Sequence, residues 1–316
     1  MKEKLPNYIY DLDEKILVLG FYKVLLKEHK KVGFTHANVA QRVGVMETTY
    51  SSYLHGRTSC SIGMLKKLCQ IYSSNIMKKA FDGNFLFTIR NKAICLPKRI
   101  TIGLAYYIGY LQGDGYLGGD GLRFGFFDEY QAQMERLNNL TFKLFKTKGK
   151  IKERFTGKSK KPSFNLEIKS LVVNSFINTV FGIPRGKKLN LSIPKIITSN
   201  KMLRHYLAGL YDADGTLPKN PHTAKQLFID ITLKDKKFVE EIKQTLLLFG
   251  IETLHLYKRE AKSVQSDKPS ITWELRIRKK RFILKFLQEI GFYHPDKAKR
   301  AEKLKKILYC KWNMDR

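Results

Sequence analysis

The feature that most constrains the fold is an internal duplication. Residues 94–115 (ICLPKRITIGLAYYIGYLQGDG) and 191–215 (LSIPKIITSNKMLRHYLAGLYDADG) share an apolar start, a Pro-Lys pair and a helical pattern that ends in Asp-Gly. The two Asp-Gly pairs begin at Asp114 and Asp214. A repeat is sought first because one repeated unit determines the whole architecture. We therefore predict two related halves, at 97–190 and 191–295.

The match continues beyond the Asp-Gly pairs. Residues 123–145 correspond to 227–249, and FNLEIK (164–169) corresponds to WELRIR (273–278). The strand-like segments alternate apolar and polar residues, which is typical of a sheet with one buried and one solvated face. The sequence predicts an α+β protein of two αββαββα halves. The residues expected on the polar, basic faces, as DNA contacts, are Arg123, Lys152, Arg154, Asn165, Gln226, Asp230, Thr232 and Arg276.

The rest of the chain has a different pattern. Residues 1–80 lack strand alternation and predict an all-α domain, and 81–96 predict a linker or a strand pair. Residues 296–316 predict a basic C-terminal helix. With 316 residues, the chain is long enough for two or three domains.

The charge of the chain indicates its class of partner. Fifty-nine Lys and Arg against 28 Asp and Glu give a formal charge of +31. Nucleic acid is the partner this charge favours, because neutralised phosphates release condensed counterions. No apolar stretch reaches the roughly 18 residues of a membrane helix, so a spanning protein is excluded. An anionic membrane surface is the minor alternative partner, and the spread of positive charge along the chain argues against it, so no membrane partner is expected. Four cysteines without a Cys-x-x-Cys pair, and no visible signal peptide, favour a reducing cytoplasmic, DNA-associated location, or an organellar matrix in a eukaryote.

The helices before the Asp-Gly pairs contain small residues four positions apart. Thr101 and Asn200 are predicted as their N-caps. Glycine inside a helix costs about 1 kcal/mol relative to alanine, so a compensating contact is expected. We predict that the two helices pack closely on each other and form the seam between the halves. The small residues are Gly109 and Gly113 in one helix and Gly209 and Ala213 in the other.

Each of these helices ends in a carboxylate. A helix C-terminus already carries partial negative charge, so Asp114 and Asp214 at one seam need a cation between them or a proton on one of them. Oxygen ligands, waters and a substrate phosphate are what Mg²⁺ prefers, and Mn²⁺ could replace it. Such a pair beside basic sheet faces indicates phosphodiester hydrolysis.

LAGLYDADG (207–215) differs by one residue from the nonapeptide that names the LAGLIDADG homing endonucleases, and YIGYLQGDG (107–115) is a more diverged copy. The chain resembles this family over about 90–295. The resemblance implies a pseudo-symmetric, free-standing monomer with a DNA-binding saddle of two sheets. It also implies cleavage of both DNA strands across the minor groove, with 3′ overhangs.

The resemblance further implies roles for single residues. Asp114 and Asp214 would bind the metal, with the adjacent Gly113 and Ala213 as further metal-site residues. A basic residue near the end of the last saddle strand maps onto Lys169 and Arg278, which are predicted as catalytic; arginine stays protonated and can only stabilise charge. The sixth motif position is Gln112 in one copy and Asp212 in the other, and Asp212 is predicted as an extra metal ligand or a packing residue.

Residues 39–57 resemble the helix-turn-helix of phage repressors. Ala40, Gly44 and Gly56 match its packing and turn positions. A recognition helix would begin near Glu47 and add affinity to the same DNA through its high effective concentration. The residues predicted to contact DNA there are Thr48, Thr49, Ser51, Ser52, His55 and Arg57.

The sequence leaves three functions open. The leading hypothesis is a Mg²⁺-dependent, site-specific endonuclease of double-stranded DNA. One alternative is a DNA-binding transcriptional regulator whose saddle has lost cleavage. The other is a maturase that binds intron RNA. Both aspartates favour the enzyme, because a pure binder has no use for clustered negative charge over phosphate.

Overall fold

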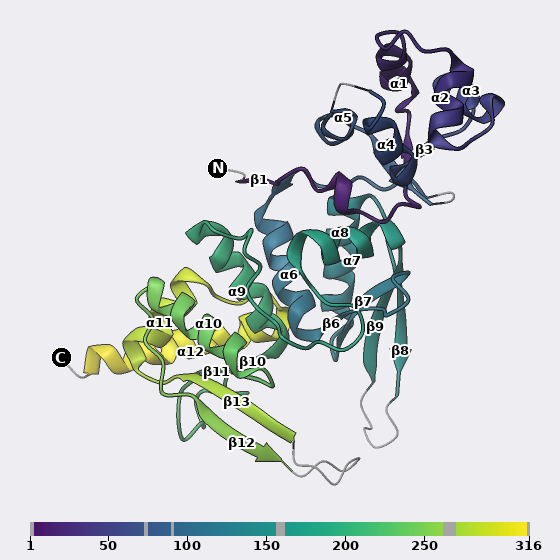
Figure 1. The fold of residues 1–316 in the computed structure, drawn as a ribbon. Helices are drawn as coiled ribbons and strands as arrows, with labels where there is room; N and C mark the ends of the chain where they lie inside the picture. Colours follow the sequence, from purple (N-terminus) through teal and green to yellow (C-terminus); the bar gives the residue numbers. More distant parts are fainter. Residues whose placement is uncertain (1–2, 73–74, 90–91, 156–161, 262–269, 315–316) are drawn as a thin grey trace.

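The two predicted halves are present in a computed structural model of the chain, and they lie side by side (Figure 1). The structure describes residues 3–72, 75–89, 92–155, 162–261 and 270–314. The predicted segments 1–80, 81–96 and 296–316 therefore each contain a few residues outside the described part. No helix within the described ranges is both long enough and apolar enough to cross a membrane.

The halves follow the same element order, helix-strand-strand-helix-strand-strand-helix, as predicted. The first half contains α6 (Ile102–Asp114), β6 (Gly115–Leu117), β7 (Arg123–Asp128), α7 (Gln131–Phe145), β8 (Lys150–Arg154), β9 (Ser163–Lys169) and α8 (Leu171–Phe181). The second contains α9 (Asn200–Asp214), β10 (Gly215–Thr216), β11 (Ile229–Leu233), α10 (Lys236–Leu248), β12 (Tyr257–Ala261), β13 (Ser270–Ile277) and α11 (Lys280–Glu289). The two sheets have equivalent strand orders, β6-β7-β9-β8 and β10-β11-β13-β12, and all their pairs are antiparallel.

The ends of the two motif helices agree closely with the sequence pattern. Thr101 caps α6, since its side chain accepts from the backbone N–H of Leu104 at 3.2 Å. In α9 the cap is Ser199 rather than Asn200, because the serine hydroxyl accepts from the N–H of Met202 at 3.4 Å. The prediction for the second cap was therefore wrong by one residue. In the second sheet, β11 begins at Ile229, so Gln226 precedes the strand instead of lying in it.

The sequence predicts an all-α N-terminal region, but the structure contains both helices and a small sheet there. Its helices are α1 (Tyr22–His29), α2 (His36–Val43), α3 (Glu47–Leu54), α4 (Ile62–Cys69) and α5 (Ile76–Asp82), with a 3₁₀ turn at Ile9–Asp11. It also contains a sheet of three short strands, β3 (Cys60–Ser61), β2 (Leu17–Leu19) and β4 (Leu86–Thr88). These strands have two or three residues each, which is too short for an alternating pattern to be visible in the sequence.

The N-terminal region is fastened to the first half. β1 (Glu3–Lys4) pairs with β5 (Arg99–Ile100), and the Tyr8 hydroxyl donates to the carbonyl of Pro97 at 2.6 Å. The backbone N–H of Asp13 donates to the hydroxyl of Ser175 on α8 at 3.0 Å. The ring of Tyr8 also packs edge-on against Phe176 of α8. The N-terminal region therefore rests on α8, away from the strands of the two sheets (Figure 1).

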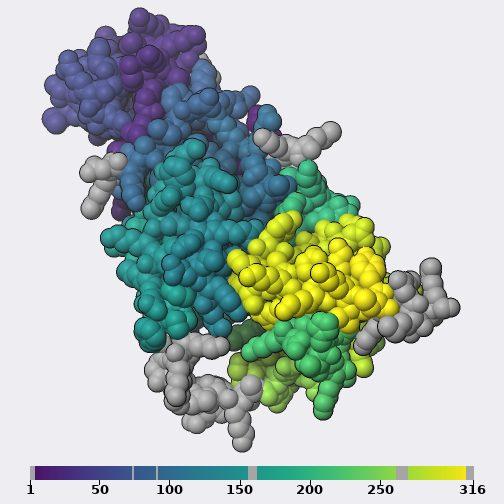
Figure 2. Space-filling model, turned by 180° about the vertical axis from the view of Figure 1, so that it is seen from behind, coloured from purple at the N-terminus to yellow at the C-terminus, as the bar shows by residue number. Residues whose placement is uncertain are grey.

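The C-terminal helix is longer than predicted at its start. α12 (Pro295–Met314) packs against α11 and lies over the second half, with its beginning beside the first half (Figure 2). Among its residues up to 310, Ala301, Leu304 and Leu308 are buried, at helical spacing.

α6 and α9 pack directly against each other at the centre of the molecule. A Cβ added to Gly109 would overlap the carbonyl oxygen of Tyr206, and a Cβ added to Gly209 would overlap that of Tyr106. The two helix backbones are thus in reciprocal contact, and only glycine fits at both positions. As their four-residue spacing predicts, the small residues of each helix lie on the side that contacts the other helix.

Gly109→Ala or Gly209→Ala should destabilise the protein by about 1–3 kcal/mol or more, because backbone rather than a mobile side chain blocks the added methyl. The free energy of unfolding in denaturant measures this. Gly103→Ala is the matched control, since its Cβ would meet side chains and no backbone: the end of Leu140 at 3.1 Å and Oγ1 of Thr101 at 3.9 Å. Equal stability of the control and the seam variants would contradict the close approach of the helices.

Candidate catalytic site between the two motif helices

Close packing along the seam brings the last residues of α6 and α9 together. A Cβ on Gly113 would lie 2.8 Å from Oδ2 of Asp214 and would overlap Cβ of Ala213. Asp214 therefore lies against the backbone that precedes Asp114. The structure brings the two predicted carboxylates into one site, and both remain partly exposed to solvent.

Burial and the neighbouring charge act together on these carboxylates. Burial, and secondarily the charge of Asp114, raises the pKa of Asp214 to about 7. Burial also raises the pKa of Asp114, although the ammonium groups of Lys297 and Lys188 oppose that shift. Burial and, for Asp214, the neighbouring carboxylate therefore disfavour the ionised form of the pair, in the direction that the like-charge argument predicts.

Two lysines that were not predicted from the sequence contact the C-terminal ends of α6 and α9. The ammonium of Lys188 donates to the carbonyls of Gln112, at 2.9 Å, and Gly113 at the end of α6. The ammonium of Lys297 donates to the carbonyls of Tyr211, Asp212 and Ala213 at the end of α9, at 3.1, 2.6 and 2.7 Å. A cation is favourable at a helix C-terminus, so the lysines offset both the helix dipoles and the aspartates.

These contacts also bear on the predicted metal-site residues. The carbonyl oxygens of Gly113 and Ala213 each accept from a lysine ammonium, so they face a positive charge rather than an open cation site. Burial lowers the pKa of Lys188 to about 8, while the two aspartates oppose that change. We retain Asp114 and Asp214 as the candidate metal ligands.

The sixth motif positions have a packing role. The Tyr106 hydroxyl of α6 donates to Oδ2 of Asp212 at 2.7 Å, and the Tyr206 hydroxyl of α9 donates to Oε1 of Gln112. Each helix thus bonds the sixth residue of the other. Asp212 is 1% exposed, and burial raises its pKa to about 6. The prediction that Asp212 could be an extra metal ligand is wrong, because this carboxylate lies inside the seam.

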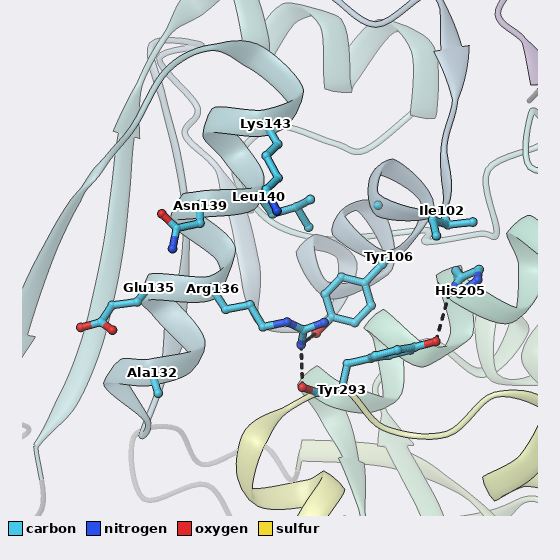
Figure 3. Close-up of a pocket in the computed structure, with 11 residues that line it drawn as sticks. Ile102, Tyr106, Ala132, Glu135, Arg136, Asn139, Leu140, Lys143, His205 and Tyr293 are labelled. Carbon is cyan, nitrogen blue, oxygen red and sulfur yellow. Dashed lines mark hydrogen bonds between the residues drawn. The ribbon is translucent and has the colours of Figure 1, made fainter.

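A pocket of about 590 Å³ opens beside the N-terminal half of α6 (Figure 3). Arg136 lies between the rings of Tyr106 and Tyr293, 4.8 and 5.5 Å from their centroids. It donates to the carbonyl of Tyr293 at 2.7 Å. Tyr106 is two turns before Asp114, about 12 Å along the helix, so this pocket is separate from the carboxylates.

A third carboxylate lies near the pair. Asp128, at the end of β7, accepts from the hydroxyl of Tyr110 and from Nε2 of His294 at 3.2 Å. Its charge contributes to the raised pKa of Asp114. Asp128 follows the buried alternation of Phe124 and Phe126, so periodicity alone does not distinguish it from a core position.

The structure does not bring Lys169 and Arg278 to the carboxylates. Asp114 immediately precedes Gly115, which pairs with Phe126, the partner of Leu166. Extended by one residue, this register puts Asp114 level with Asn165, and Lys169 lies four positions further along β9, an offset of about 13 Å along the strand. Arg278 has the same relation to Asp214, since Gly215, Ile231 and Leu275 form one row. The prediction that Lys169 and Arg278 lie beside the carboxylates is therefore corrected by the strand register, which a single sequence does not reveal.

On the polar face of the second sheet, buried carboxylates hold arginines. Asp230, 6% exposed, accepts from Nε and Nη2 of Arg276 at 3.2 and 2.9 Å. Glu274 accepts from Arg276 at 2.8 Å and also pairs with Arg259. Arg276 remains at the surface and Asp230 lies beneath it, bonded to its guanidinium. Contrary to the prediction, Asp230 does not face the solvent.

The first sheet has a different polar face. Arg123 pairs with Asp120 at 3.1 Å, Lys152 lies 3.6 Å from Glu167, and Arg154 lies over the ring of Phe127. Asn165 is 1% exposed, so its side chain does not reach the surface as predicted. Gln226, before β11, is exposed, and Thr232 is half-buried.

The predicted recognition segment forms a helix where expected. α2 ends at Val43 and is capped by Gly44, which has a left-handed conformation with φ 76°, and α3 begins at Glu47. Thr48, His55 and Arg57 are exposed, whereas Thr49, Ser51 and Ser52 are half-buried. Ser52 donates to the carbonyl of Thr48 and His55 contacts that of Ser51, both at 2.8 Å.

Residues 201–291 match the family model of the LAGLIDADG-like domain. The matched residues lie in the second half of the chain, and the first half repeats the topology of that half.

Two curated relatives are similar to part of the chain. One is the replication factor C small subunit of Methanocaldococcus jannaschii, 30% identical over 206 residues, which are 65% of this chain and 10% of the relative. The other is the tRNA-splicing ligase RtcB of Methanopyrus kandleri, 33% identical over 143 residues, which are 41% of this chain and 14% of the relative. The chain spans only a small part of the length of both relatives.

Solved structures with distant similarity include full-length DUF199/WhiA from Thermatoga maritima, with a TM-score of 0.45 and 17% identity over 66% of this chain and 60% of that one. The homing endonuclease I-DmoI has a TM-score of 0.42 and 18% identity over 60% of this chain and 94% of that one. The homing endonuclease I-WcaI, bound to its DNA recognition sequence, has a TM-score of 0.43 and 15% identity over 63% of this chain and 85% of that one.

Asp214→Asn should stabilise the metal-free protein at pH 8 by on the order of 1 kcal/mol or more. Folding raises the pKa of Asp214 from 3.8 to about 7, so its ionised form is less favourable in the folded than in the unfolded chain. Wild type therefore loses stability as pH rises from about 4 to 7, and the asparagine variant lacks this loss. Unfolding by denaturant in EDTA at pH 4 and pH 8 measures the difference.

Asp120→Asn is the control for this prediction. Hydrogen bonds from the Leu122 backbone and from Arg123 lower the pKa of Asp120, which is exposed, so its replacement should give no gain at pH 8. If wild type and Asp214→Asn were equally stable at both pH 4 and pH 8, the raised pKa of Asp214 in the folded protein would be contradicted.

Proposed function

We propose that this chain is a site-specific endonuclease that cuts both strands of double-stranded DNA in a divalent-metal-dependent reaction. The observation that carries the proposal is the pair of aspartates at abutting helix ends, one of which has its pKa raised to about 7. A protein that only bound DNA would be more stable without this pair. A function that needs two carboxylates explains why the chain has this pair of aspartates despite its cost in stability.

The donor set fits Mg²⁺. Asp114 and Asp214 would supply carboxylate oxygens, and Mg²⁺ characteristically keeps waters and binds substrate phosphate in addition. When bound, the ion would supply an activated water and would stabilise the leaving oxygen of the phosphodiester. Mn²⁺ has similar ligand preferences and is proposed as a substitute.

The chain's own residues would hold the helix ends and the substrate. Lys188 and Lys297 fix the last turns of α6 and α9, which sets the positions of both aspartates. Their positive charges would also stabilise the charge that develops on the phosphate in the transition state. Arg276, Arg259, Lys152 and Arg154 lie on the strands of the two sheets and would contact the DNA.

The polar faces of the two sheets are not equivalent. Matching the rows by register makes Glu167 the counterpart of Arg276, and Asn165 the counterpart of Glu274. Two halves with opposite charges at matching positions would read different base sequences. We therefore propose a non-palindromic target, cut by one monomer with one strand per half and with 3′ overhangs.

The N-terminal region is proposed as a further DNA-binding module. The exposed residues of α3 and its end, Thr48, His55 and Arg57, form the surface that a major groove would take. Because this region rests on α8, its position relative to the first half is fixed by direct contacts.

A selection from randomised duplex DNA tests the proposed activity. The protein binds in Ca²⁺, Mg²⁺ is then added, and both bound DNA and new ends are sequenced. Wild type should yield cut ends at one long site, whereas Asp114→Asn and Asp214→Asn should bind that site and cut at least about 10²-fold more slowly, because the metal loses a ligand. The control Asp120→Asn should cut normally.

The other outcomes of the selection discriminate among functions. An enriched sequence without ends would identify a DNA-binding regulator. No enriched duplex would refute the DNA proposal and direct the search to structured intron RNA. A fully active Asp214→Asn would contradict the shared carboxylate site.

Arg57→Glu should weaken binding of the full site by about tenfold or more at low salt, since it replaces a phosphate contact by repulsion. The rate of cutting at saturating protein should remain unchanged, because Arg57 is far from the carboxylates. Lys78→Glu, on the exposed side of α5, makes the same charge change outside α3 and is the control. Equal affinities for both variants would contradict DNA binding by α3.

A further inference from the structure

The contacts of His294 define a link between the two halves. His294 directly precedes α12 and is 2% exposed. Its Nδ1 accepts from the backbone N–H groups of Asp296 and Lys297, at 3.2 and 3.4 Å, and so caps the helix. A ring nitrogen that accepts carries no proton, so Nε2 carries it and donates to Asp128 at 3.2 Å.

Asp128 belongs to the other half. It is the last residue of β7, and its side chain is 8% exposed. The hydroxyl of Tyr110, on α6, and the backbone N–H of Tyr130, at 2.8 Å, also donate to its carboxylate. The start of α12 is therefore fastened to the first half by a buried acceptor that is itself fixed.

The segment that precedes Lys297 has a second anchor. The backbone N–H of Tyr293 donates to both oxygens of Asp212, at 3.1 and 3.0 Å. Arg136, on α7 of the first half, donates to the carbonyl of the same Tyr293 (Figure 3). Three residues after His294, Lys297 then reaches the carbonyls at the end of α9.

Lys188 is held in a different way. It follows α8, within its own half, and its segment is fixed there by two hydrogen bonds. The N–H of Gly186 donates to the carbonyl of Leu117 at 2.8 Å, and Arg185 donates to Asn174 at 2.8 Å. Three residues after Lys188, the N–H of Leu191 donates to Asp235 of the second half at 2.9 Å. The support of Lys188 thus does not involve Asp128 or His294, whereas the segment of Lys297 is held by both.

We propose that Asp128 and His294 are positioning residues that hold Lys297 at the end of α9, so that one lysine of the site is in place only when the two halves are docked. Its effect on DNA cutting rests on the proposed function, but the positioning itself does not. Because the two lysines are supported separately, loss of this link should impair one of the two strand cuts and leave Lys188 in place.

Two sets of substitutions separate the link from the fold of α12. His294→Asn keeps a side chain that can cap the helix but is too short to reach Asp128. Asp128→Ala removes the acceptor from the opposite side without altering α12. Asp128→Asn keeps an oxygen that can accept from Nε2 and is the conservative variant. Lys299→Ala, at an exposed position of α12, is the control.

The first experiment measures reductive methylation of lysines in the full chain by mass spectrometry. In His294→Asn and Asp128→Ala, the labelling rate of Lys297 should rise by about tenfold, the change that loss of one hydrogen bond to a charged group brings. Lys188 should keep its wild-type rate, and Asp128→Asn should remain close to wild type at both lysines. Unchanged labelling of Lys297, or an equal rise at Lys188, would overturn the proposal.

The second experiment measures cutting of a supercoiled plasmid that carries the selected site. His294→Asn and Asp128→Ala should accumulate nicked circles relative to wild type and Lys299→Ala, while binding in Ca²⁺ is unchanged. Equal slowing of both strands, without nicked circles, would contradict the role of Lys297 in one cut. If wild type failed to cut any DNA, the proposed function would fail, and the labelling experiment would still decide the positioning.

Discussion

The reciprocal contact of Gly109 with Tyr206 and of Gly209 with Tyr106 sets the distance between α6 and α9, and the other features of the site depend on it. Because the two backbones touch, Gly113 lies against Asp214, and two carboxylates share one partly buried site. The same approach lets each helix bond the sixth motif residue of its partner, Asp212 or Gln112. The helix glycines, which weaken an isolated helix, are compensated by this contact.

Charge balance at the end of the seam depends on lysines that come from outside the motif helices. Lys188 and Lys297 bond the final carbonyls of α6 and α9 and stabilise the ionised aspartates. They do not fully offset burial and the charge of Asp114, since the pKa of Asp214 is still about 7. The folded protein is therefore less stable than the same fold would be without the ionised aspartates. Such a cost is expected of a catalytic site.

The sequence predicts the architecture because the repeat and the alternation express packing directly. Leu166 and Ile168 alternate with polar residues on β9, and Gly109 and Gly209 recur at helical spacing. The short strands of the N-terminal region leave no comparable pattern. Sheet register was also invisible, so Lys169 and Arg278 were expected beside the carboxylates although they lie about 13 Å further along their strands. Lys188 and Lys297 follow the final helices of their halves, at 74 and 83 residues from the aspartates. No repeat or periodicity in the sequence links either lysine to the aspartates, as the recurring glycines link the two helices.

The central claim is that the ends of α6 and α9 form one joint metal site. Titration of Mn²⁺ into the metal-free protein, followed by calorimetry in wild type, Asp114→Asn, Asp214→Asn and the double variant, tests it most directly. A joint site predicts that each single substitution abolishes as much binding as the double substitution, because both carboxylates hold the same ion. Two independent sites would lose binding additively, with half of the stoichiometry left in each single variant, and that result would contradict the account.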